Sequence, residues 1–562
     1  MVVEETKTSV VIVGAGPAGL SLAIELGMRG VSCLVIDEKD EDALVLKANA
    51  TQARTMEHFR RMGFADEIRA QGIPLDYPTD VAYFTRIGTH ELARLRLPAP
   101  KDVKKLVLNS TGAWSTPELP HRCNQMFIER ILRDHAKKNN AIDLRFRCKL
   151  LEFEDHGDRV TVIAQEQPDG RQLRISCDYL VGCDGAHSPV RKKLGIEYEG
   201  TSEVSRDFLS GPMCVIYFEC PDFYDRVSCD PAWMYWTVNE TRRGILVAVN
   251  GVDSFLLHAQ THKGEPLLDP LPQARAQEIF EEVFGGDCPP IKLLHASYWH
   301  AGFSLVAQKY GQGRVLIAGD AAHLFTPSGG LGYNTAVDDV ANLGWKLAAV
   351  INGYGGPGLI ATYSVERWPM GRRNTAIAGG FAESIGGYVP PPHLEEDTAQ
   401  GDKARAEAGE FLNNHVRREF NIPGVTFGIR YDGSPIILSD APPPPDSTSD
   451  YVPSGVPGGR APHLWLDGAR SLYDCFGREF TLLRLSDAAG TEGWVTAAGE
   501  KAIPLDVLDL TGDPCLSQAR ELYGADLVLV RPDQHIAWRG GAHDEPGLIL
   551  SQVLGWTTKT EQ

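Results

Sequence analysis

The chain has 562 residues, and its 55 Lys and Arg against 74 Asp and Glu give a formal net charge of -19. This length predicts more than one domain, and a composition of 43% hydrophobic and 23% charged residues excludes wholesale disorder. The negative charge disfavours binding to nucleic acid or to anionic membranes. Because no apolar run of about 18 residues is present, no membrane-spanning helix is predicted.

The N-terminus and the cysteines indicate a cytoplasmic protein. Residues 1–8 are acidic and polar, and they lack the basic start of a secretory signal. The 11 Cys residues include no C-x-x-C pair, which is typical of free thiols in a reducing compartment. No His cluster accompanies Cys177 and Cys183, so no metal site is expected.

The first motif is a glycine-rich turn between a strand and a helix. An apolar strand is predicted over residues 9–13, and the residues after it are Gly14, Ala15, Gly16, Pro17, Ala18 and Gly19. A helical pattern then runs to residue 29, and a second strand over residues 31–36 ends at Asp37. This context predicts a dinucleotide site, with a pyrophosphate at the helix N-terminus. The ribose acceptor would be Asp37 or, as the alternative, Glu38.

Two further motifs follow predicted strands. Residues 179–181 form a buried strand pattern that leads to Asp184 and Gly185, which is also the pattern of a plain β-turn. Residues 314–318 predict another strand, which leads through Asp320 and a glycine-rich segment into a helix over residues 334–351. Such a segment aims backbone N–H groups at an anion, and the lack of a G-K-[ST] sequence excludes a P-loop.

Together the three motifs resemble those of the class A FAD-dependent aromatic monooxygenases, the family of para-hydroxybenzoate and phenol hydroxylases. The similar segments are GAGPAG at 14–19, CDGAHSPVR at 183–191 and GDAAHLFTPSGGLGYN at 319–334. RAPHLWL at 460–466 and VRPDQHIAWR at 530–539 are similar to the C-terminal region of the phenol-hydroxylase branch. That branch carries a thioredoxin-like third domain there.

The resemblance implies roles for individual residues. Those that would hold FAD are Gly14, Ala15, Gly16, Pro17, Ala18, Gly19, Asp37, Glu38, Lys47, Gln125, Asp184, Asp320, Gly330, Leu331, Gly332, Tyr333 and Asn334. The three glycines of the first motif would contact the pyrophosphate, and Asp320 the ribityl chain. Asp184 would also lie near NADPH, and residues 330–334 would surround the flavin ring with backbone donors.

Three positions depart from the family pattern or have an open role. Lys47 stands where much of the family has a pyrophosphate-binding arginine; it keeps the charge but loses the bidentate fork. Asn49 stands where phenol hydroxylases place an Asp, so a carboxylate base is not expected there. Arg54 fits the branch pattern and would reach flavin or NADPH, or else lie on a helix surface.

The sequence offers three candidates for the group that hydrogen-bonds the substrate hydroxyl. Tyr217 and Tyr235 are candidates, because tyrosine side chains of the central sheet can hydrogen-bond the substrate hydroxyl in the resembling family. His300 is a third candidate. The alternative for each is a structural role, as a packed sheet aromatic for the tyrosines and as a hydrogen-bonded core histidine for His300. The aromatic walls for a flat ring are expected from Trp233, Tyr235, Trp236, Tyr298 and Trp299.

The predicted fold class is α/β, with a Rossmann-like FAD-binding domain, an inserted antiparallel-sheet substrate domain and a C-terminal thioredoxin-like domain. The FAD-binding domain must be discontinuous, because its three motifs lie far apart in the sequence, and apolar alternation between residues 200 and 300 predicts the antiparallel sheet. The expected boundaries are 1–75, 116–200 and 300–400 for the FAD-binding domain, 76–115 and 201–299 for the substrate-binding domain, 401–454 for a helix and linker, and 455–562 for the third domain.

The resemblance implies an enzyme that hydroxylates a phenolic or polyphenolic ring through a C4a-hydroperoxyflavin. FAD would be bound, and NADPH, or NADH, would be a transient co-substrate, since only one dinucleotide fingerprint is present. The expected partners are a small aromatic substrate and O2, without nucleic acid or membrane, and a homodimer is left open. The alternatives are a flavin epoxidase or Baeyer–Villiger monooxygenase on the same scaffold, and a flavin-binding protein without turnover.

Overall fold

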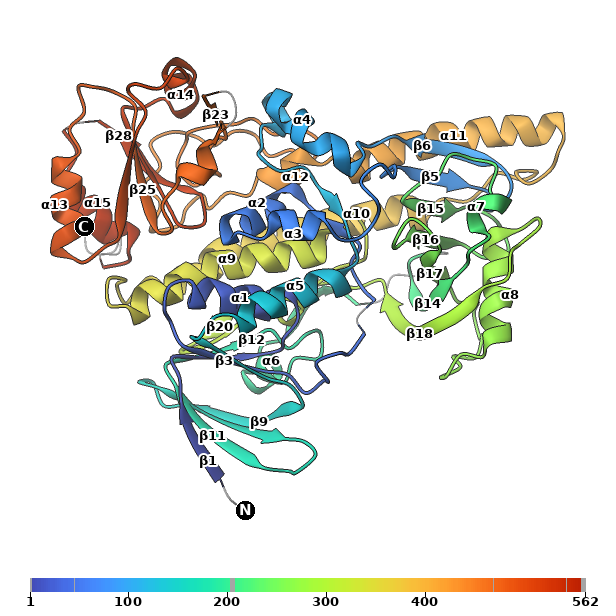
Figure 1. Cartoon of the computed structure of the whole chain (residues 1–562), viewed down its shortest axis with the longest axis horizontal. Helices are drawn as coiled ribbons and strands as arrows, with labels where there is room; N and C mark the ends of the chain where they lie inside the picture. The colour runs from blue at the N-terminus through green and yellow to red at the C-terminus, as the bar shows by residue number, and fades with distance from the viewer. Residues whose placement is uncertain (1–2, 45, 203–207, 468–469, 542, 557–562) are drawn as a thin grey trace.

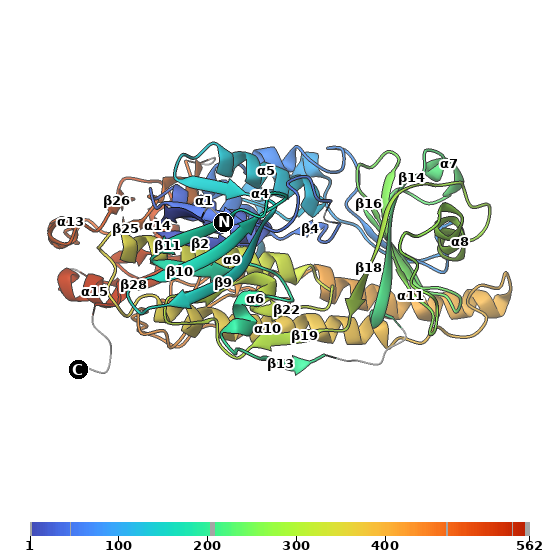
Figure 2. The same cartoon turned by 90° about the horizontal axis from the view of Figure 1, so that it is seen from below.

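The computed structural model describes residues 3–44, 46–202, 208–467, 470–541 and 543–556. Figure 1 shows a central α/β unit, a mainly green sheet unit on one side of it and the orange-red C-terminal unit on the other. Three long helices lie lengthwise in the molecule, as the view from below in Figure 2 shows. They are α9 (Leu331–Ile351), α10 (Ala361–Gly386) and α11 (Ala399–Phe420).

The central unit is built on a six-stranded sheet with the strand order β20-β21-β12-β2-β3-β8. All neighbours pair in parallel except β20 and β21. The strands are β2 (Val10–Val13), β3 (Cys33–Ile36), β8 (Ile142–Arg145), β12 (Tyr179–Gly182), β20 (Gly311–Gln312) and β21 (Val315–Ile317). Strands β2, β3, β12 and β21 confirm the strands predicted beside the three motifs.

Both faces of this sheet are covered, which explains its continuous apolar strands. Helices α1 (Pro17–Gly27) and α9 pack on one face, and a four-stranded sheet packs on the other (Figure 1). The four-stranded sheet consists of β1 (Val3–Lys7), β9 (Cys148–Asp155), β10 (Val160–Glu166) and β11 (Gln172–Cys177). Two smaller sheets consist of β4 (Ala50–Thr51) with β7 (His121–Arg122), and of β13 (Tyr198–Thr201), β19 (Ser304–Ala307) and β22 (His323–Leu324).

The second unit is a seven-stranded sheet with the order β18-β14-β17-β16-β15-β5-β6. Every neighbouring pair is antiparallel except β15 with β5. Two strands from residues 81–95 therefore lie in one sheet with strands from residues 211–301. The strands are β5 (Val81–Phe84), β6 (Glu91–Leu95), β14 (Gly211–Glu219), β15 (Met234–Thr237), β16 (Gly244–Ala248), β17 (Ser254–Gln260) and β18 (Lys292–Ala301).

The two faces of the seven-stranded sheet have different neighbours. Helices α7 (Phe223–Arg226) and α8 (Gln273–Phe284) cover one face, where Phe218 of β14 meets Phe280 at 4.9 Å between ring centroids. The other face is directed toward α11, where Tyr83 of β5 lies edge-on to His415. Alternate residues of one strand therefore face either the helical cover or the side of α11.

The C-terminal unit has the strand order and connections of a thioredoxin-like fold. Its sheet order is β26-β25-β27-β28, with β25 and β26 parallel and the other pairs antiparallel. Cys475 and Cys515 are both free. The elements are β25 (Phe480–Arg484), α13 (Glu492–Glu500), β26 (Leu505–Asp509), α14 (Leu516–Tyr523), β27 (Leu527–Val530), β28 (Ile536–Gly540) and α15 (Pro546–Val553), preceded by the short strands β23 (Trp465–Leu466) and β24 (Arg470–Ser471).

Buried polar contacts join this unit to the central one. Arg54 is 3% exposed and donates to the carbonyl of Asp533 at 2.6 Å and to the side chain of Gln534 at 2.8 Å. The expectation that Arg54 lies on a helix surface is therefore wrong, and its guanidinium is occupied by the C-terminal unit. Arg460 likewise pairs with Glu57 of helix α2 (Ala53–Met62).

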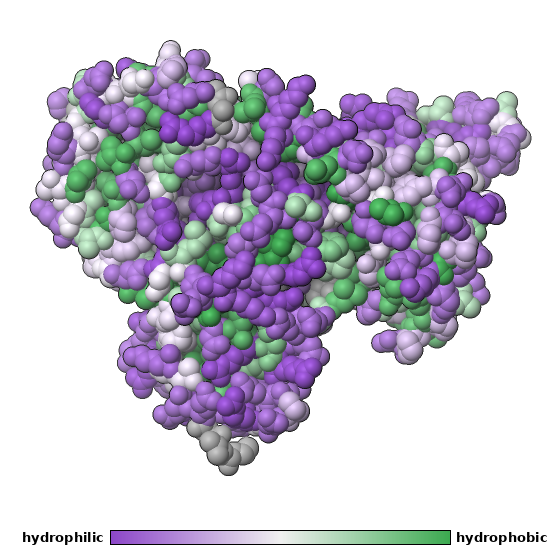
Figure 3. All heavy atoms as spheres, viewed as in Figure 1, coloured by the Kyte–Doolittle hydropathy of each residue, from purple (hydrophilic) through white to green (hydrophobic). Residues whose placement is uncertain are grey.

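The remaining helices are short or of medium length. They are α3 (Ala65–Arg69), α4 (Val103–Asn109), α5 (Gln125–Lys137), α6 (Pro189–Lys193) and α12 (Pro423–Phe427). One of them, α12, is buried at every residue. Polar side chains cover much of the face seen in Figure 3, and its hydrophobic spots are scattered. Within the described ranges, no helix combines the length and the apolar character needed to cross a membrane.

Candidate active site

The predicted nucleotide-binding positions meet at one edge of the six-stranded sheet. Val13 of β2 lies opposite Gly182 of β12 and Ile36 of β3, and Gly182 lies opposite Ile317 of β21. Because these strands are parallel, the three glycine motifs and Asp37 all leave the sheet at its carboxyl edge. Open α/β sheets bind their ligands outside this edge.

The first glycine motif combines tight packing with one open position. A Cβ on Gly14 would lie 2.2 Å from the carbonyl oxygen of Cys183, and a Cβ on Gly19 would lie 1.9 Å from that of Gly14. The φ of Gly14, 104°, also favours glycine. Nothing lies within 4 Å of the Cβ position of Gly16, directly before α1 begins at Pro17. The backbone at the N-terminus of this helix is therefore open to an anionic ligand.

Asp37 is bonded to the glycine turn. Its Oδ2 accepts from the backbone N–H of Ala15 at 2.7 Å, and its Oδ1 accepts from that of Lys39 at 2.9 Å. A carboxylate has about four acceptor sites, so capacity for a ribose hydroxyl remains. Glu38 is exposed and its carboxylate lies 3.6 Å from Nζ of Lys149.

Asp184 caps the helix that follows it. Its Oδ1 accepts from the hydroxyl of Ser188 at 2.6 Å, and its Oδ2 accepts from the backbone N–H of Val190 at 3.0 Å. Burial raises the pKa of Asp184. The carboxylate thus stabilises the turn before α6 in the second motif.

Asp320 and Lys47 lie across from each other at the sheet edge. Nζ of Lys47 is 3.6 Å from Oδ2 of Asp320, and the side chains are 64% and 42% exposed. The hydroxyl of Tyr198 donates to the carbonyl of Asp320 at 2.6 Å, and the guanidinium of Arg191 lies 3.9 Å from the centroid of the Tyr198 ring. These contacts tie the second motif to the third and leave both charged groups accessible to a ligand.

The third motif leads into α9 through a left-handed glycine. Gly330 has a φ of 62° and precedes the first helical residue, Leu331. Asn334 fixes this turn, because its Nδ2 donates to the carbonyls of Gly330 at 2.6 Å and Ala50 at 3.0 Å. Its Oδ1 accepts from the backbone N–H of Gln52 at 2.8 Å. The start of α9 is thus joined to β4.

The other side chains at this helix start contact protein. Leu331 packs in an apolar cluster with Phe381, and Tyr333 packs against a cluster that contains Met56. The Cβ position of Gly332 lies 3.4 Å from the ring of Phe325. The first N–H groups of a helix lack intrahelical partners, so the backbone supplies the donors available to a ligand here.

Gln125 and Asn49 lie in a neighbouring polar group. Nε2 of Gln125 donates to Glu129 at 2.7 Å, and its Oε1 accepts from the backbone N–H of Ala48 at 3.4 Å. Oδ1 of Asn49 accepts from Nδ2 of Asn124 at 2.7 Å. The position at which an acidic residue could have served as a base is therefore occupied by a neutral amide pair.

This donor set fits FAD. The open backbone at Gly16 and the start of α1 suit a pyrophosphate, Asp37 suits a ribose, and the start of α9 offers N–H donors at a second point of the same edge. Among the described residues, no group of three or more His, Cys, Asp or Glu is placed to hold a metal ion.

The buried carboxylate of Asp339 on α9 contacts residues of the third motif. Nε2 of His323 and Nε of Arg367 lie 2.6 Å and 2.8 Å from the oxygens of Asp339 on α9. Burial alone would raise the pKa of Asp339, but the charges of His323 and Arg367 more than offset it and hold the pKa below its usual value. The backbone N–H of Gly319 points to the same carboxylate at 3.4 Å, so α9 and the Gly319 turn are held together.

The three candidates for contact with a substrate hydroxyl lie in different surroundings. Tyr235 is fully buried on the face covered by α7 and α8, and its hydroxyl accepts from the backbone N–H of Ala232 at 2.8 Å. Tyr217 lies on the opposite face and is half-buried, with its hydroxyl 3.5 Å from Oγ of Ser254. His300 is exposed near the end of β18.

The predicted aromatic wall is divided between the two faces. Trp236 stacks on Tyr83, and Trp299 lies edge-on to His258, all on the side of α11. Tyr298 alternates with Trp299 along β18 and lies with Tyr235 on the side of α8. Strand alternation assigns these residues to the two faces.

Sequence reasoning missed a polar pair on α11. Oε1 of Glu419 accepts from the backbone N–H of Gly329 at 2.9 Å, and its Oε2 lies 2.9 Å from Nε2 of His415. Both side chains are buried, and the ring of His415 lies edge-on to Tyr83 of the seven-stranded sheet. Glu419 and His415 thus link the glycine segment to that sheet. Their i, i+4 spacing was visible in the sequence, but their partners were not.

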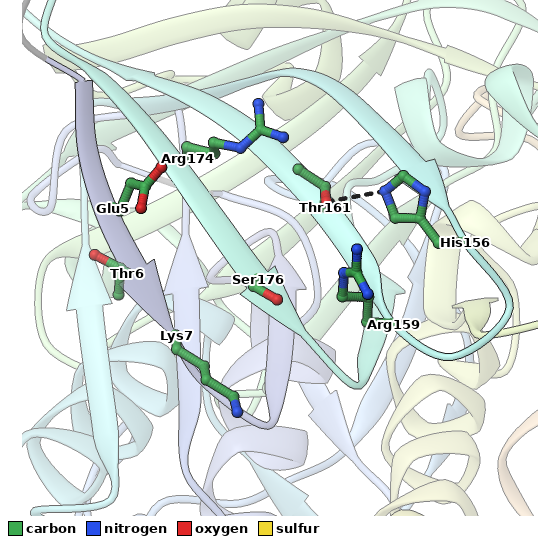
Figure 4. A pocket seen from close by; sticks show the side chains of 8 residues that line it. All are labelled: Glu5, Thr6, Lys7, His156, Arg159, Thr161, Arg174 and Ser176. Carbon is green, nitrogen blue, oxygen red and sulfur yellow. Dashed lines mark hydrogen bonds between the residues drawn. The ribbon is translucent and has the colours of Figure 1, made fainter.

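A separate hollow lies on the outer face of the four-stranded sheet, with a volume of about 450 Å³ (Figure 4). Its lining residues are Glu5, Thr6, Lys7, His156, Arg159, Thr161, Arg174 and Ser176. None of the predicted site residues lines it, so it is not the candidate site.

Comparisons with known proteins cover almost the whole chain. Residues 7–378 match the family described as FAD binding domain, and residues 454–556 match the family described as aromatic-ring hydroxylase, C-terminal. The FAD-dependent monooxygenase apdD of Emericella nidulans is 29% identical, over 98% of this chain and 91% of the relative. The phenol 2-monooxygenase of a Pseudomonas species is 28% identical, over 98% of this chain and 92% of the relative.

Solved structures are similar over the same extent. RebC with bound 7-carboxy-K252c has a TM-score of 0.86 at 33% identity, covering 98% of this chain and 100% of the other. The ternary complex of aklavinone-11 hydroxylase with FAD and aklavinone has a TM-score of 0.80 at 27% identity, covering 97% of this chain and 99% of the other. The FAD in that complex agrees with the donor set described above.

Proposed function

Because the chain belongs to the class A family of FAD-dependent aromatic-ring monooxygenases, we propose that it uses NADPH and O2 to hydroxylate a phenolic or polyphenolic ring. Relatives named phenol 2-monooxygenase and 2,4-dichlorophenol 6-monooxygenase support a phenolic substrate, and aklavinone-11 hydroxylase supports a polycyclic one. NADPH would visit rather than reside, since one dinucleotide fingerprint serves one permanent site. A cytoplasmic location and a homodimer stay predictions from the sequence.

One observation carries the proposal. The carboxyl edge of the six-stranded sheet, which fits FAD, is joined through Glu419 and His415 to the face of the seven-stranded sheet that bears Tyr83 and Trp236. Tyr83 and Trp236 are themselves buried, so a flat aromatic ligand would lie at the margin of that face, next to the glycine segment before α9. Aromatic walls with few polar groups are typical of such sites.

The residues of the edge would hold FAD in distinct ways. Gly16 and the start of α1 would receive the pyrophosphate, Asp37 the adenosine ribose, and Asp320 the ribityl chain. Lys47 would neutralise part of the pyrophosphate charge from its exposed position. FAD, when bound, supplies the two-electron and oxygen chemistry that no side chain can supply. The protein orients the ring, excludes water and holds the phenol proton.

Of the two candidate tyrosines of the seven-stranded sheet, Tyr217 is the better placed to hydrogen-bond a substrate hydroxyl. It shares its face with the residues on the side of α11. Among the described residues, its hydroxyl has a single hydrogen-bond partner, Oγ of Ser254 at 3.5 Å. Tyr235 faces the helical cover and already accepts a backbone hydrogen bond. A positioned phenol could accept or share the proton of the substrate hydroxyl.

The test is a product analysis. Purified protein would be screened with phenols, hydroxybenzoates and polyphenols for stimulated oxidation of NADPH and of NADH, and the best substrate would be converted under ¹⁸O₂. We expect FAD as the extracted flavin, and one labelled oxygen on an aromatic carbon. An epoxide, a ring-expanded ester, or hydrogen peroxide alone across the panel would contradict the proposal.

A further inference from the structure

Arg122 is a buried cation without a countercharge. Its side chain is 6% exposed, and it forms neither an ion pair nor a hydrogen bond with any residue that the structure describes. Burial lowers the pKa of Arg122 to about 10, and no carboxylate offsets this effect, yet the group stays protonated at neutral pH. An uncompensated buried charge is destabilising, so its retention points to a ligand that supplies the missing charge.

Other deeply buried arginines of the molecule differ from Arg122 in this respect. Five of them are 3% exposed or less, and each forms an ion pair with a carboxylate: Arg54, Arg242, Arg367, Arg460 and Arg531. Arg191, which is 5% exposed, forms no ion pair with a described residue, but its guanidinium donates to the carbonyl of Ile196 at 2.7 Å. Arg122 differs from these six arginines because its guanidinium has neither a carboxylate nor a carbonyl partner among the described residues.

Arg122 lies at the seam between the candidate FAD site and the seven-stranded sheet. Its strand, β7, pairs with β4, where Arg122 is opposite Ala50. The carbonyl of Ala50 accepts from Asn334 at the start of α9, and the Cβ position of Gly330 is 3.1 Å from the Cβ of Ala50. On its other side, the guanidinium carbon lies 4.4 Å from the ring centroid of Trp233, directly before β15. Arg122 thus contacts Trp233 beside the seven-stranded sheet. Its own strand, β7, pairs with β4, which is bonded to the start of α9.

The stacking leaves the hydrogen-bonding capacity of the guanidinium unused. The Trp233 ring, whose centroid is 4.4 Å from the guanidinium carbon, offers no oxygen acceptor to the N–H donors, which lie in the plane of the group. In-plane donors bind a carboxylate or another anionic oxygen in a fork geometry. The nearby amide pair of Asn49 and Asn124 adds no negative charge that could satisfy the cation.

We propose that Arg122 is an anion-binding residue of the substrate pocket, which pairs with a carboxylate or an ionised phenol of the aromatic substrate. This inference rests on the proposed function for the aromatic nature of the ligand. Asn49 is a neutral amide, so it adds no negative charge to the pocket. The guanidinium of Arg122 would therefore bind an anionic group of the substrate. The same charge would stabilise a phenolate relative to the phenol, since an adjacent cation favours the charged form.

The test measures binding without turnover. The FAD-loaded protein would be titrated, without NADPH, with 4-hydroxybenzoate and 6-hydroxy-2-naphthoate and with their neutral amides, using flavin absorbance and tryptophan fluorescence. We expect an acid to bind wild type about 10 to 100 times more tightly than its amide, as charge-assisted hydrogen bonds allow. Arg122→Gln should abolish this preference, and Arg122→Lys should restore part of it.

A second titration separates the two anion sources. For bound 2-naphthol, the ultraviolet spectrum gives the pH at which the phenol ionises. If the ligand anion is a phenolate, this pH should be lower in wild type than in Arg122→Gln. If it is a carboxylate, only the preference for acids over amides should respond. Either response supports the proposal.

A matched control variant and three further measurements show whether an effect is specific to Arg122. Arg130→Gln changes an exposed arginine that also stacks on an aromatic ring, Phe127, and it should behave as wild type. FAD content, the melting temperature and the NADPH dissociation constant would be measured for each variant. Loss of FAD or NADPH binding in place of the acid preference, or equal binding of acids and amides by wild type, would overturn the assignment. Acid binding that depends on Arg122, without hydroxylated product, would contradict the proposed function alone.

Discussion

At the scale of single residues, Asp37 joins two tasks. Its carboxylate accepts from the backbone N–H groups of Ala15 and Lys39, at 2.7 Å and 2.9 Å, so it shapes the glycine turn before any nucleotide binds. The remaining lone pairs can accept from a ribose. The side chain that we propose as the ribose acceptor therefore also supports the glycine turn at which we propose that the pyrophosphate binds.

We predict that Asp37→Ala weakens FAD binding by about 1.5–3 kcal/mol, the usual value of hydrogen bonds to a charged group. Asp37→Asn should lie between Ala and wild type, because its amide oxygen still accepts one of the two backbone bonds. The FAD dissociation constant, from flavin fluorescence, measures the effect. Equal affinity in wild type and Asp37→Ala would refute this role.

At the scale of elements, α11 reaches into the glycine segment of another unit. The carboxylate of Glu419 accepts from the backbone N–H of Gly329, and its Oε2 lies 2.9 Å from Nε2 of His415. The ring of His415 in turn lies edge-on to Tyr83. Helix α11 begins at Ala399, beyond the residues matched to the FAD binding domain family, which end at 378. The glycine segment of the candidate FAD site is thus held by an element outside that region.

We predict that Glu419→Ala weakens FAD binding and lowers the melting temperature, since a buried N–H without a partner costs about 1–3 kcal/mol. Glu419→Gln keeps an oxygen for Gly329 and should retain most of the affinity. The control is Glu410→Ala, on the exposed side of the same helix. FAD titration and thermal melts would decide, and an Ala variant that matches Glu410→Ala in both would contradict the role of Glu419.

At the scale of the whole molecule, buried ion pairs fix the C-terminal unit to α9 and α10. Glu366 of α10 contacts Arg531 at 2.8 Å and Lys346 at 2.6 Å, all with fully buried side chains. Burial alone would raise the pKa of Glu366, but Arg531 and Lys346 more than offset it and hold the pKa at about 2. The C-terminal unit is therefore an integral part of the fold rather than an independent appendage.

The low pKa gives a defined dependence of stability on pH. The unfolded state takes up the proton of Glu366 near its usual pKa of 4.5, and the folded state only near 2. The stabilisation is therefore complete above pH 4.5 and is lost as the pH falls toward 2. We predict that Glu366→Gln flattens the pH dependence of the unfolding free energy in this window.

The same variant should lower the unfolding free energy at pH 7 by about 3–5 kcal/mol, since it leaves buried cations without their carboxylate. Denaturant unfolding across the pH range measures both effects. Glu383→Gln, an exposed change on the same helix, is the control. If the two variants show the same pH profile, Glu366 does not carry the acid sensitivity.

The parts of the fold and site that could be predicted from the sequence are those formed by contiguous backbone. The G-x-G-x-x-G turn, its flanking strands, Asp37 and the glycine segment before α9 are local patterns, and the parallel register then brings them to one edge. The alternation along β14 likewise placed Met213, Val215 and Tyr217 on one face.

Which partner each long side chain meets depends on tertiary packing. Arg54 bonds Gln534, 480 residues away, and Glu419 bonds Gly329 of another element. Which face of the seven-stranded sheet is turned to the helical cover, and hence the burial of Tyr235, depends on the packing of α7 and α8. The isolation of Arg122 is also a tertiary property. Periodicity shows where a side chain points relative to its own strand or helix, whereas a missing countercharge becomes evident only when all the neighbours are in place.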